Sequence, residues 1–146
     1  MKTILTALVL TIGAAMPAAA ELITVNSSKS VAETMDALEA AVNGAGATVF
    51  ARIDHAKGAA SVELEMNEAQ TLIFGNPKLG TPAMQADLRA SLFLPLKVAV
   101  YAQGSGSVLT YQDPAEMFSG LDIASDAKFV AMMTGALGKL TGKAAE

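Results

Sequence analysis

Three helix-start signals are spaced along this sequence, and each one comes within a few residues of the end of a strand-like run. Ser30 to Glu33 (SVAE) is a capping box, in which the Ser30 hydroxyl accepts from the Glu33 N–H and the Glu33 carboxylate accepts from the Ser30 N–H. Thr81-Pro82 places an N-cap residue before a proline at the first helical position. Asp113 to Glu116 (DPAE) is a second capping box. A chain that alternates strands with helices in this way packs its helices against a sheet.

The periodicity between these signals predicts about five strands. Strand, helix, strand at the spacing found over 22–54 is typical of a βαβ unit with parallel strands and a right-handed crossover. The glycine-bearing segment Gln103–Ser107 predicts a hairpin in the C-terminal half. We therefore expect an α+β fold: a single domain with a mixed sheet of about five strands, built from βαβ units and this hairpin, with helices mainly on one face. The expected strands are 22–26, 48–54, 71–74, 96–102 and 108–112, and the last helix is expected to begin near Ser125 or Asp126.

The first twenty residues have the pattern of a secretory signal peptide. Lys2 precedes an uncharged apolar run, Ile4–Ala15, and Ala18-Ala19-Ala20 supplies the small residues of a cleavage site. The apolar run is shorter than the roughly 20 residues that span a bilayer. We expect cleavage between Ala20 and Glu21, so that 21–146 is one α+β domain. The mature chain is then expected to be periplasmic or secreted, without a membrane span.

The composition excludes several classes of function. The chain has no cysteine, so an exported form must be held together by packing and hydrogen bonds alone. Its net charge is −4 and no run of basic residues occurs, which argues against a nucleic-acid partner. It has no tryptophan and two tyrosines, so it offers few rings on which bases could stack.

Metal-binding and catalytic residues are scarce. His55 is the only histidine, and with no cysteine the chain lacks the usual ligands of zinc, copper and iron. We expect no metal and no cofactor. No G-x-S-x-G motif occurs, and a Ser-His-Asp arrangement would have to use His55 as its base. The sequence therefore favours a protein that is not an enzyme.

The loop Gly75–Thr81 resembles a phosphate-binding loop only superficially. It nearly matches G-x-x-x-x-G-K-[ST], but the lysine before Thr81 is missing. Phosphate cradles are made of successive backbone N–H groups, and Pro77 and Pro82 each remove one. We conclude that this is not a nucleotide-binding loop.

The expected topology would still bring polar residues together. If the first three strands are parallel, their carboxyl ends lie at one edge of the sheet, where open α/β sheets bind ligands. We then expect a pocket for a small polar ligand or an anion at this edge. The alternative is that Asn76 only makes an Asx-turn and the prolines stiffen a connection. The candidate ligand-binding residues are Asp54, His55, Asn76, Lys78, Thr81 and Tyr111.

Four ordered motifs resemble the domain-of-unknown-function family 302. They are ARIDHAKGAA (51–60), TLIFGNPKLGTPAMQ (71–85), LPLKVAVY (94–101) and LTYQDPAE (109–116). The resemblance runs from about Val31 to Leu140, and it implies a compact α+β domain, dimers in some members, and no known activity. One departure is that 87–97 carries Arg89 and Ser91 where the family is usually more apolar. The signature positions that the resemblance implies are Asp54, His55, Gly75, Asn76, Pro77, Thr81, Pro95, Tyr111, Asp113 and Pro114.

Three functions remain open from the sequence. The first is an exported, non-enzymatic homodimer that binds a small polar ligand or a partner near His55 and Asn76. The second is a hydrolase or isomerase in which His55 is the general base and Tyr111 or Asp113 assists. The third is a purely structural interaction module. The first two require His55 to lie near the Gly75–Thr81 loop.

Overall fold

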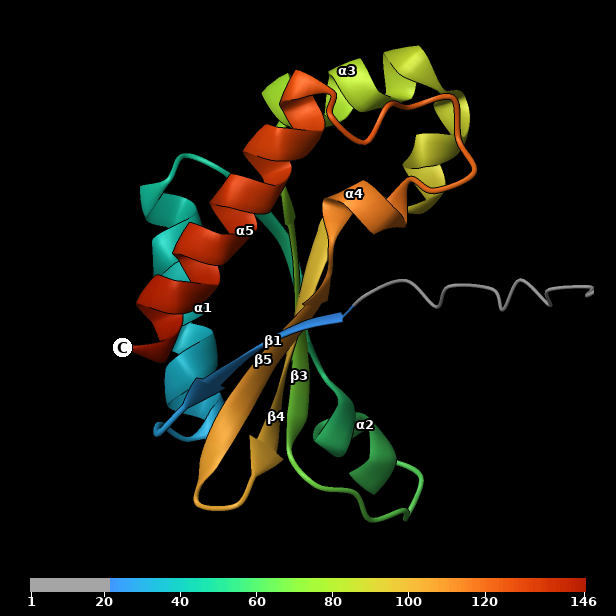
Figure 1. Cartoon of the computed structure of the whole chain (residues 1–146). Helices are drawn as coiled ribbons and strands as arrows, with labels where there is room; N and C mark the ends of the chain where they lie inside the picture. The colour runs from blue at the N-terminus through green and yellow to red at the C-terminus, as the bar shows by residue number, and fades with distance from the viewer. Residues whose placement is uncertain (1–21) are drawn as a thin grey trace, which may run out of the picture.

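A computed structural model describes residues 22–146, and the leader predicted at 1–20 lies outside this range. Its centre is one five-stranded sheet with the order β1-β5-β4-β3-β2. Every pair of neighbouring strands is antiparallel. Figure 1 shows the sheet nearly edge-on, between the two long helices on one side and shorter helical segments on the other. The strands are β1 (Leu22–Ser27), β2 (Thr48–Asp54), β3 (Ala69–Gly75), β4 (Leu96–Gln103) and β5 (Gly106–Gln112).

The helices divide into a long pair and several short segments. The long helices α1 and α5 lie against each other and cover one face of the sheet (Figure 1). Helix α2 lies beside one end of the sheet, and α3 and α4 lie around the other end, where both also contact α5 (Figure 1). The helices are α1 (Val31–Gly44), α2 (His55–Ala60), α3 (Pro77–Ala86), the 3₁₀ helix η1 (Leu88–Leu92), α4 (Pro114–Met117) and α5 (Lys128–Ala145).

The α+β class, the five strands and the C-terminal-half hairpin are confirmed, but the mixed sheet and its parallel βαβ units are wrong, since all four strand pairs are antiparallel. Helix α1 carries the chain from one edge of the sheet to the other, so β1 and β2 point the same way without being neighbours. Three antiparallel strands then fill the space between them. The spacing of strand, helix and strand predicted the direction of β2 correctly and its neighbours incorrectly, because that spacing does not say how many strands a crossover passes.

The core lies between the sheet and the two long helices. Leu72, Val98 and Leu109 are fully buried on the covered face, and they are drawn from three neighbouring strands. Met35 of α1 and Leu137 of α5 belong to the same core cluster as these three strand residues. Burying a side chain of this size contributes about 1.5–3 kcal/mol relative to leaving it exposed. Because the chain has no disulfides, burial of these side chains between the sheet and the two long helices is the main source of its folding stability.

The opposite face of the sheet has no long helix across it, and we call it the open face. Because successive side chains of a strand alternate between faces, the neighbours of the buried residues point here. Thr71, Ala99 and Thr110 lie side by side on this face and are partly exposed. Helix α2 borders the open face at one end, and α3, η1 and α4 border it at the other (Figure 1).

The observed N-termini of the helices agree only in part with those predicted from the sequence. The Ser30 capping box is present with both hydrogen bonds. Helix α3, however, begins after Asn76, whose Oδ1 accepts from the Lys78 N–H at 3.0 Å, so Thr81-Pro82 lies inside the helix. Asp113 caps α4 through the Ala115 N–H rather than the Glu116 N–H, so the second capping box predicted at Asp113 to Glu116 is wrong. The last helix begins at Lys128, slightly later than expected.

Candidate functional site

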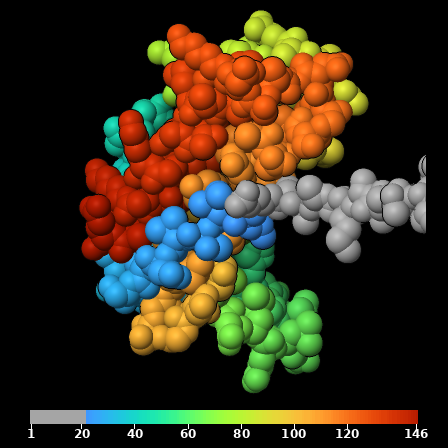
Figure 2. Space-filling model, in the orientation of Figure 1, coloured from blue at the N-terminus to red at the C-terminus, as the bar shows by residue number. Residues whose placement is uncertain are grey.

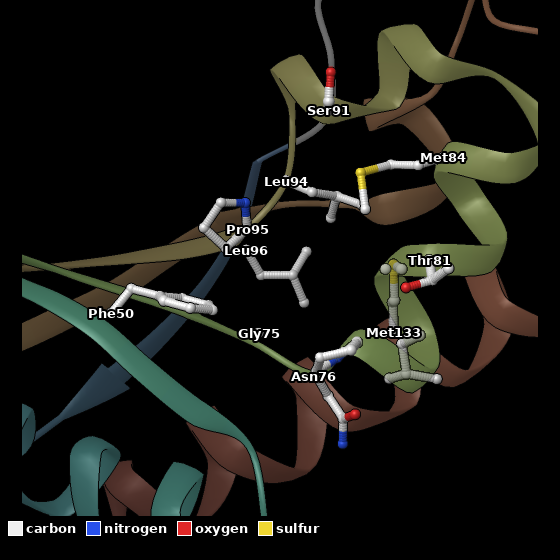
Figure 3. A pocket seen from close by; sticks show the side chains of 13 residues that line it. Phe50, Gly75, Asn76, Thr81, Met84, Ser91, Leu94, Pro95, Leu96 and Met133 are labelled. Atoms are coloured by element: carbon white, nitrogen blue, oxygen red, sulfur yellow. The ribbon is translucent and has the colours of Figure 1, made fainter.

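A cavity of about 340 Å³ lies where the end of β3, the start of β4, α3 and η1 meet. Figure 3 shows Phe50 on one side of this cavity and Met84 and Thr81 on the other. Met133 of α5 and Leu96 of β4 also line it, so the cavity reaches the core layer. The lining residues are Phe50, Gly75, Asn76, Pro77, Leu79, Gly80, Thr81, Met84, Ser91, Leu94, Pro95, Leu96 and Met133.

The Gly75–Thr81 sequence builds one wall of this cavity. Asn76 ends β3 and caps α3, and Pro77 occupies the first helical turn, where its missing N–H has no cost. A Cβ at Gly75 would lie 3.3 Å from a ring atom of Phe50 and 3.4 Å from the Pro95 Cβ. A Cβ at Gly80 would lie 3.7 Å from the Leu94 Cδ1. Both glycines therefore keep space open beside the cavity.

The lining is almost entirely apolar. Leu94, Leu96, Met84 and Met133 supply aliphatic and thioether surface, and Phe50 adds a ring at the rim, where it is 60% exposed. Methionine side chains adapt to ligands of different shapes because they are unbranched and polarisable. The polar side chains of the lining are Asn76, Thr81 and Ser91, and no lining residue within the described 22–146 is charged.

A charged cluster fixes the segment behind this wall. Asp87 lies between α3 and η1, and its carboxylate accepts three hydrogen bonds from the Arg89 guanidinium and one from the Arg89 backbone N–H. It also accepts from the backbone N–H of Asp122 at 3.0 Å. The Arg89 guanidinium, followed by these backbone N–H groups, holds the pKa of Asp87 well below its usual range. The cluster anchors η1, which carries the cavity residue Ser91.

The structure does not bring the predicted site residues together. In the β2–β3 pair, Asp54 faces Gln70 and Thr48 faces Gly75. Since each residue of a strand advances the chain by about 3.3 Å, His55 and Asn76 lie at opposite ends of this pair, roughly 20 Å apart. The prediction that they share one rim is wrong. It failed because β3 runs antiparallel to β2, which puts its carboxyl end at the other edge.

Each predicted residue has its own local environment. Asp54 caps α2 by accepting from the Lys57 N–H at 2.9 Å. His55 Nε2 lies 2.9 Å from the Thr71 Oγ1 beside the open face. Lys78 is exposed and does not line the cavity, whereas Asn76 and Thr81 do.

Tyr111 does not join His55 either. It is only 8% exposed and follows Leu109 by two residues, so it lies on the helix-covered face of β5. His55 instead pairs with Thr71 at the border of the open face. The general-base arrangement that the second hypothesis requires around the Gly75–Thr81 loop is therefore not assembled.

Sequence reasoning missed most of the cavity. Met84 and Leu94 are ten residues apart, and Met133 comes from the last helix, so only the tertiary fold brings all three together. One signal was visible: Phe50 interrupts the alternation of 48–54. The register of β2 against β3 shifts between Val49 and Ala51, and Phe50 sits at this bulge. Bulges commonly redirect a side chain toward a functional site.

Within 22–146, no three His, Cys, Asp or Glu side chains are grouped closely enough to hold a metal ion. Among the helices of the same range, none combines the length and the apolar character that a membrane span needs.

Comparisons with known proteins agree on the fold. The family model described as "Domain of unknown function DUF302" matches residues 23–142. A crystal structure of an uncharacterized conserved DUF302 protein from Bacillus stearothermophilus superimposes with a TM-score of 0.77. The two chains are 18% identical, and the match covers 84% of this chain and 97% of the other. At this identity the likeness shows the fold alone.

Curated relatives are similar over part of their length. A protein named fluoride-specific ion channel FluC 1 in Brucella suis is 40% identical over 117 residues, which is 78% of this chain and 46% of that protein. A protein of the same name in Brucella abortus and one named FluC 2 in Brucella melitensis are also 40% identical, over 43% of their length. This chain thus spans less than half the length of these relatives.

Proposed function

This chain belongs to the DUF302 family, and from that premise we propose that it is an exported, non-enzymatic homodimer that binds a small, mainly apolar ligand. The ligand site is the cavity between β3, β4, α3 and η1. The observation that carries this proposal is the lining: aliphatic, thioether and aromatic side chains surround the space, and no charged side chain joins them. The expected ligand therefore changes from a polar molecule to an apolar one.

The size of the cavity limits the ligand. Its 340 Å³ falls within the range of about 300–1,000 Å³ typical of small-molecule sites. It is also about twice the volume of an apolar cavity of roughly 150 Å³ that holds benzene. A ligand on the order of ten non-hydrogen atoms would fill it. Because a charge buried without a partner is costly, the bound part of the ligand is uncharged.

Binding is favoured over catalysis by the placement of His55. A general base must lie within about 2.6–3.2 Å of the proton that it removes, or act through one water. His55 is at the other end of the β2–β3 pair, and the polar side chains of the cavity are an amide and two hydroxyls. The hydrolase or isomerase alternative would need a second base at this cavity, and the lining residues supply none.

A homologous set of probes tests the ligand site. We expect 1-octanol to raise the melting temperature of the chain 21–146 and to bind in calorimetry, since a ligand that binds only the folded state stabilises it. Octanoate and octylamine should bind at least tenfold more weakly, because their charged ends are not paired in the cavity. If 1-octanol and its shorter homologues bind no better than the charged probes, the proposal is wrong.

Two glycine variants locate the binding. Gly80→Leu should extend a side chain toward Leu94 and Met84 and reduce 1-octanol affinity at least tenfold. Gly58→Leu is the matched control, because Gly58 is also helical and a Cβ there meets nothing within 4 Å. Both variants remove a helical glycine and should keep the fold. Equal affinities for the two variants would place the ligand elsewhere.

Export rests on the leader. The run Ile4–Ala15 and the three alanines 18–20 support cleavage before Glu21 and a periplasmic or secreted protein. Intact-mass measurement of the protein purified from its host should give a chain that begins at Glu21. A chain that retains 1–20 would contradict the export proposal. It would not bear on the proposal that the cavity binds a ligand.

The Brucella relatives suggest a second candidate function. The region similar to this chain makes up less than half of proteins named as fluoride-specific ion channels. A separate domain of this kind would act as a partner module of such a channel, which is a specific form of the interaction-module alternative. Loss of this chain should then raise the sensitivity of its host to fluoride, and unchanged sensitivity would remove this candidate.

A further inference from the structure

The open face carries large apolar side chains that nothing in the described chain covers. Ile53 on β2 and Leu22 on β1 stand at its two sides, and both are strongly exposed. Leu92 of η1, which is 79% exposed, borders the same face. Exposed apolar surface that is contiguous and large usually marks an interaction site.

The segment between α2 and β3 adds a patterned patch at one end of this face. Residues 62–66 read VELEM, so that Val62, Leu64 and Met66 alternate with two glutamates. In the structure 61–63 form a turn with Glu63 at a φ of 61°, and the chain then runs to β3 without regular secondary structure. No strand pairs with this segment, and its apolar side chains are exposed, Leu64 by 64%. In Figure 2 the segment and α2 form a green lobe that projects from the body. We call 62–66 the projecting segment.

The other end of the open face has a hollow with the opposite charge. A depression of about 260 Å³ lies under η1 and is bordered by Leu22, Leu92 and Lys97, with Thr71, Ala99 and Thr110 as its floor. Lys97 is the only charged residue of its lining within the described chain. The Lys97 ammonium contacts the carbonyl oxygens of Phe93 and Pro95, and no carboxylate of 22–146 forms a salt bridge with it.

These two features complement each other. The projecting segment is apolar and acidic, and the hollow is apolar and basic. They lie at opposite ends of one face, since the segment leads into the start of β3 while Lys97 pairs with Ile73 near its end. A two-fold axis through the middle of the face would put the segment of each copy onto the hollow of the other. This is the reciprocal pattern of an isologous dimer.

We propose that two copies of this chain pack through their open faces, with the projecting segment of each copy seated in the hollow of the other. This inference rests on the homodimer of the proposed function and names its interface. Five strands about 4.8 Å apart and about seven residues long give a floor of roughly 500 Å². The two flanking walls extend it toward the roughly 800 Å² per partner of a stable interface.

The interface also accounts for association of an acidic chain. Each copy has a net charge of −4 before any leader is removed, so two copies repel each other at long range. Contacts between the glutamates of the segment and Lys97 occur twice in a two-fold dimer and oppose this repulsion locally. They also fix the relative direction of the two faces, because a parallel arrangement would bring the two acidic segments together.

Sedimentation equilibrium of the chain 21–146 tests the interface. The wild type should be a dimer, and Leu64→Glu should raise the dimer dissociation constant at least a hundredfold. Met132→Glu is the matched control, because Met132 is a 50% exposed apolar residue of α5, outside the open face. It should leave the dissociation constant within about twofold of wild type. Circular dichroism of each variant should show the wild-type fold.

A charge swap tests the pairing itself. Glu65→Lys and Lys97→Glu should each weaken the dimer about tenfold, and the double variant should recover most of the loss, since opposite charges again face each other. If Leu64→Glu and both charge reversals leave the dimer dissociation constant unchanged, this interface is disproved, although the protein would still be a homodimer. A wild type that stays monomeric at high protein concentration would disprove both. Failure of the double variant to recover would overturn the proposed register.

Discussion

The carboxylate of Asp87 accepts a hydrogen bond from the backbone N–H of Asp122, and this contact ties the turn before η1 to the segment that leads to α5. The two residues are 35 positions apart in the sequence, and Asp87 also holds the side chain of Arg89. One carboxylate thereby connects η1 and the turn before it to the segment that leads to α5, at the outer wall of the cavity.

This contact makes stability depend on pH. The pKa of Asp87 is lowered in the folded state, so its contribution is complete above the unfolded-state pKa of about 4 and is lost as pH falls toward the lower folded-state value. Asp87→Asn should reduce the free energy of unfolding in urea at pH 7, and the difference from wild type should shrink steadily below pH 4. Asp126→Asn, an exposed aspartate of the segment before α5, is the control and should show little effect at either pH. A pH-independent difference for Asp87→Asn would contradict the prediction.

Three buried hydroxyls join β1, α1 and β5. The Thr34 Oγ1 lies 2.8 Å from the Ser107 Oγ and donates to the Ser27 Oγ at 3.3 Å. Thr34→Val keeps the shape and leaves the Ser107 hydroxyl without this partner, so it should cost about 1–3 kcal/mol of unfolding free energy. Urea denaturation measures this loss. Thr134→Val, at an exposed position of α5, should change stability by less than about 0.5 kcal/mol.

The start of β5 tolerates no side chain. A Cβ at Gly106 would overlap the carbonyl oxygen of Ser27 and lie 3.2 Å from the Ser28 Cα. Both neighbours are backbone atoms that cannot rotate away, so Gly106→Ala should destabilise the fold by about 1–3 kcal/mol. Gly135→Ala should instead stabilise it by about 0.5–1 kcal/mol, because a Cβ there meets nothing within 4 Å in the middle of α5. Thermal unfolding of the two variants should therefore shift in opposite directions.

Substitution of Phe50 should affect ligand binding without affecting the stability of the fold. Its ring borders the cavity yet is largely exposed, so its removal costs the fold little. Phe50→Ala should weaken 1-octanol binding about tenfold, or roughly 1.4 kcal/mol, while the melting temperature without ligand stays near wild type. Leu88→Ala removes another exposed apolar side chain, one that does not line the cavity, and should leave the affinity unchanged. Similar affinities for both variants would exclude Phe50 from the site.

Local signals in the sequence predicted local structure well. The Ser30 capping box is complete because all of its partners lie within four residues. The start of α3 was predicted wrongly at Thr81, because Asn76 is also followed by proline and is the residue that caps the helix. The earlier cap prevails: it stands directly at the end of β3, and the helix continues through Pro82 at the loss of one backbone hydrogen bond.

The candidate site failed as a prediction for a non-local reason. Asn76 would lie near His55 only if β3 ran parallel to β2. The residues that connect the two strands do not indicate whether the strands are parallel or antiparallel. The answer comes from the whole sheet, in which β4 and β5 separate β3 from β1. Asn76 and Thr81 do lie together at a cavity, but no local pattern in the sequence connects the segments that form its apolar walls.

The position of β1 has a consequence for the order in which the molecule can assemble. Strands β2, β3 and β4 each pair with the next strand along the chain, so this part of the sheet can close as the chain lengthens. The first strand finds its only neighbour in β5, where Leu22 faces Gln112. Because β5 ends at Gln112, β1 cannot pair until the chain has been made at least that far, and its edge of the sheet closes after β2 to β5 have paired.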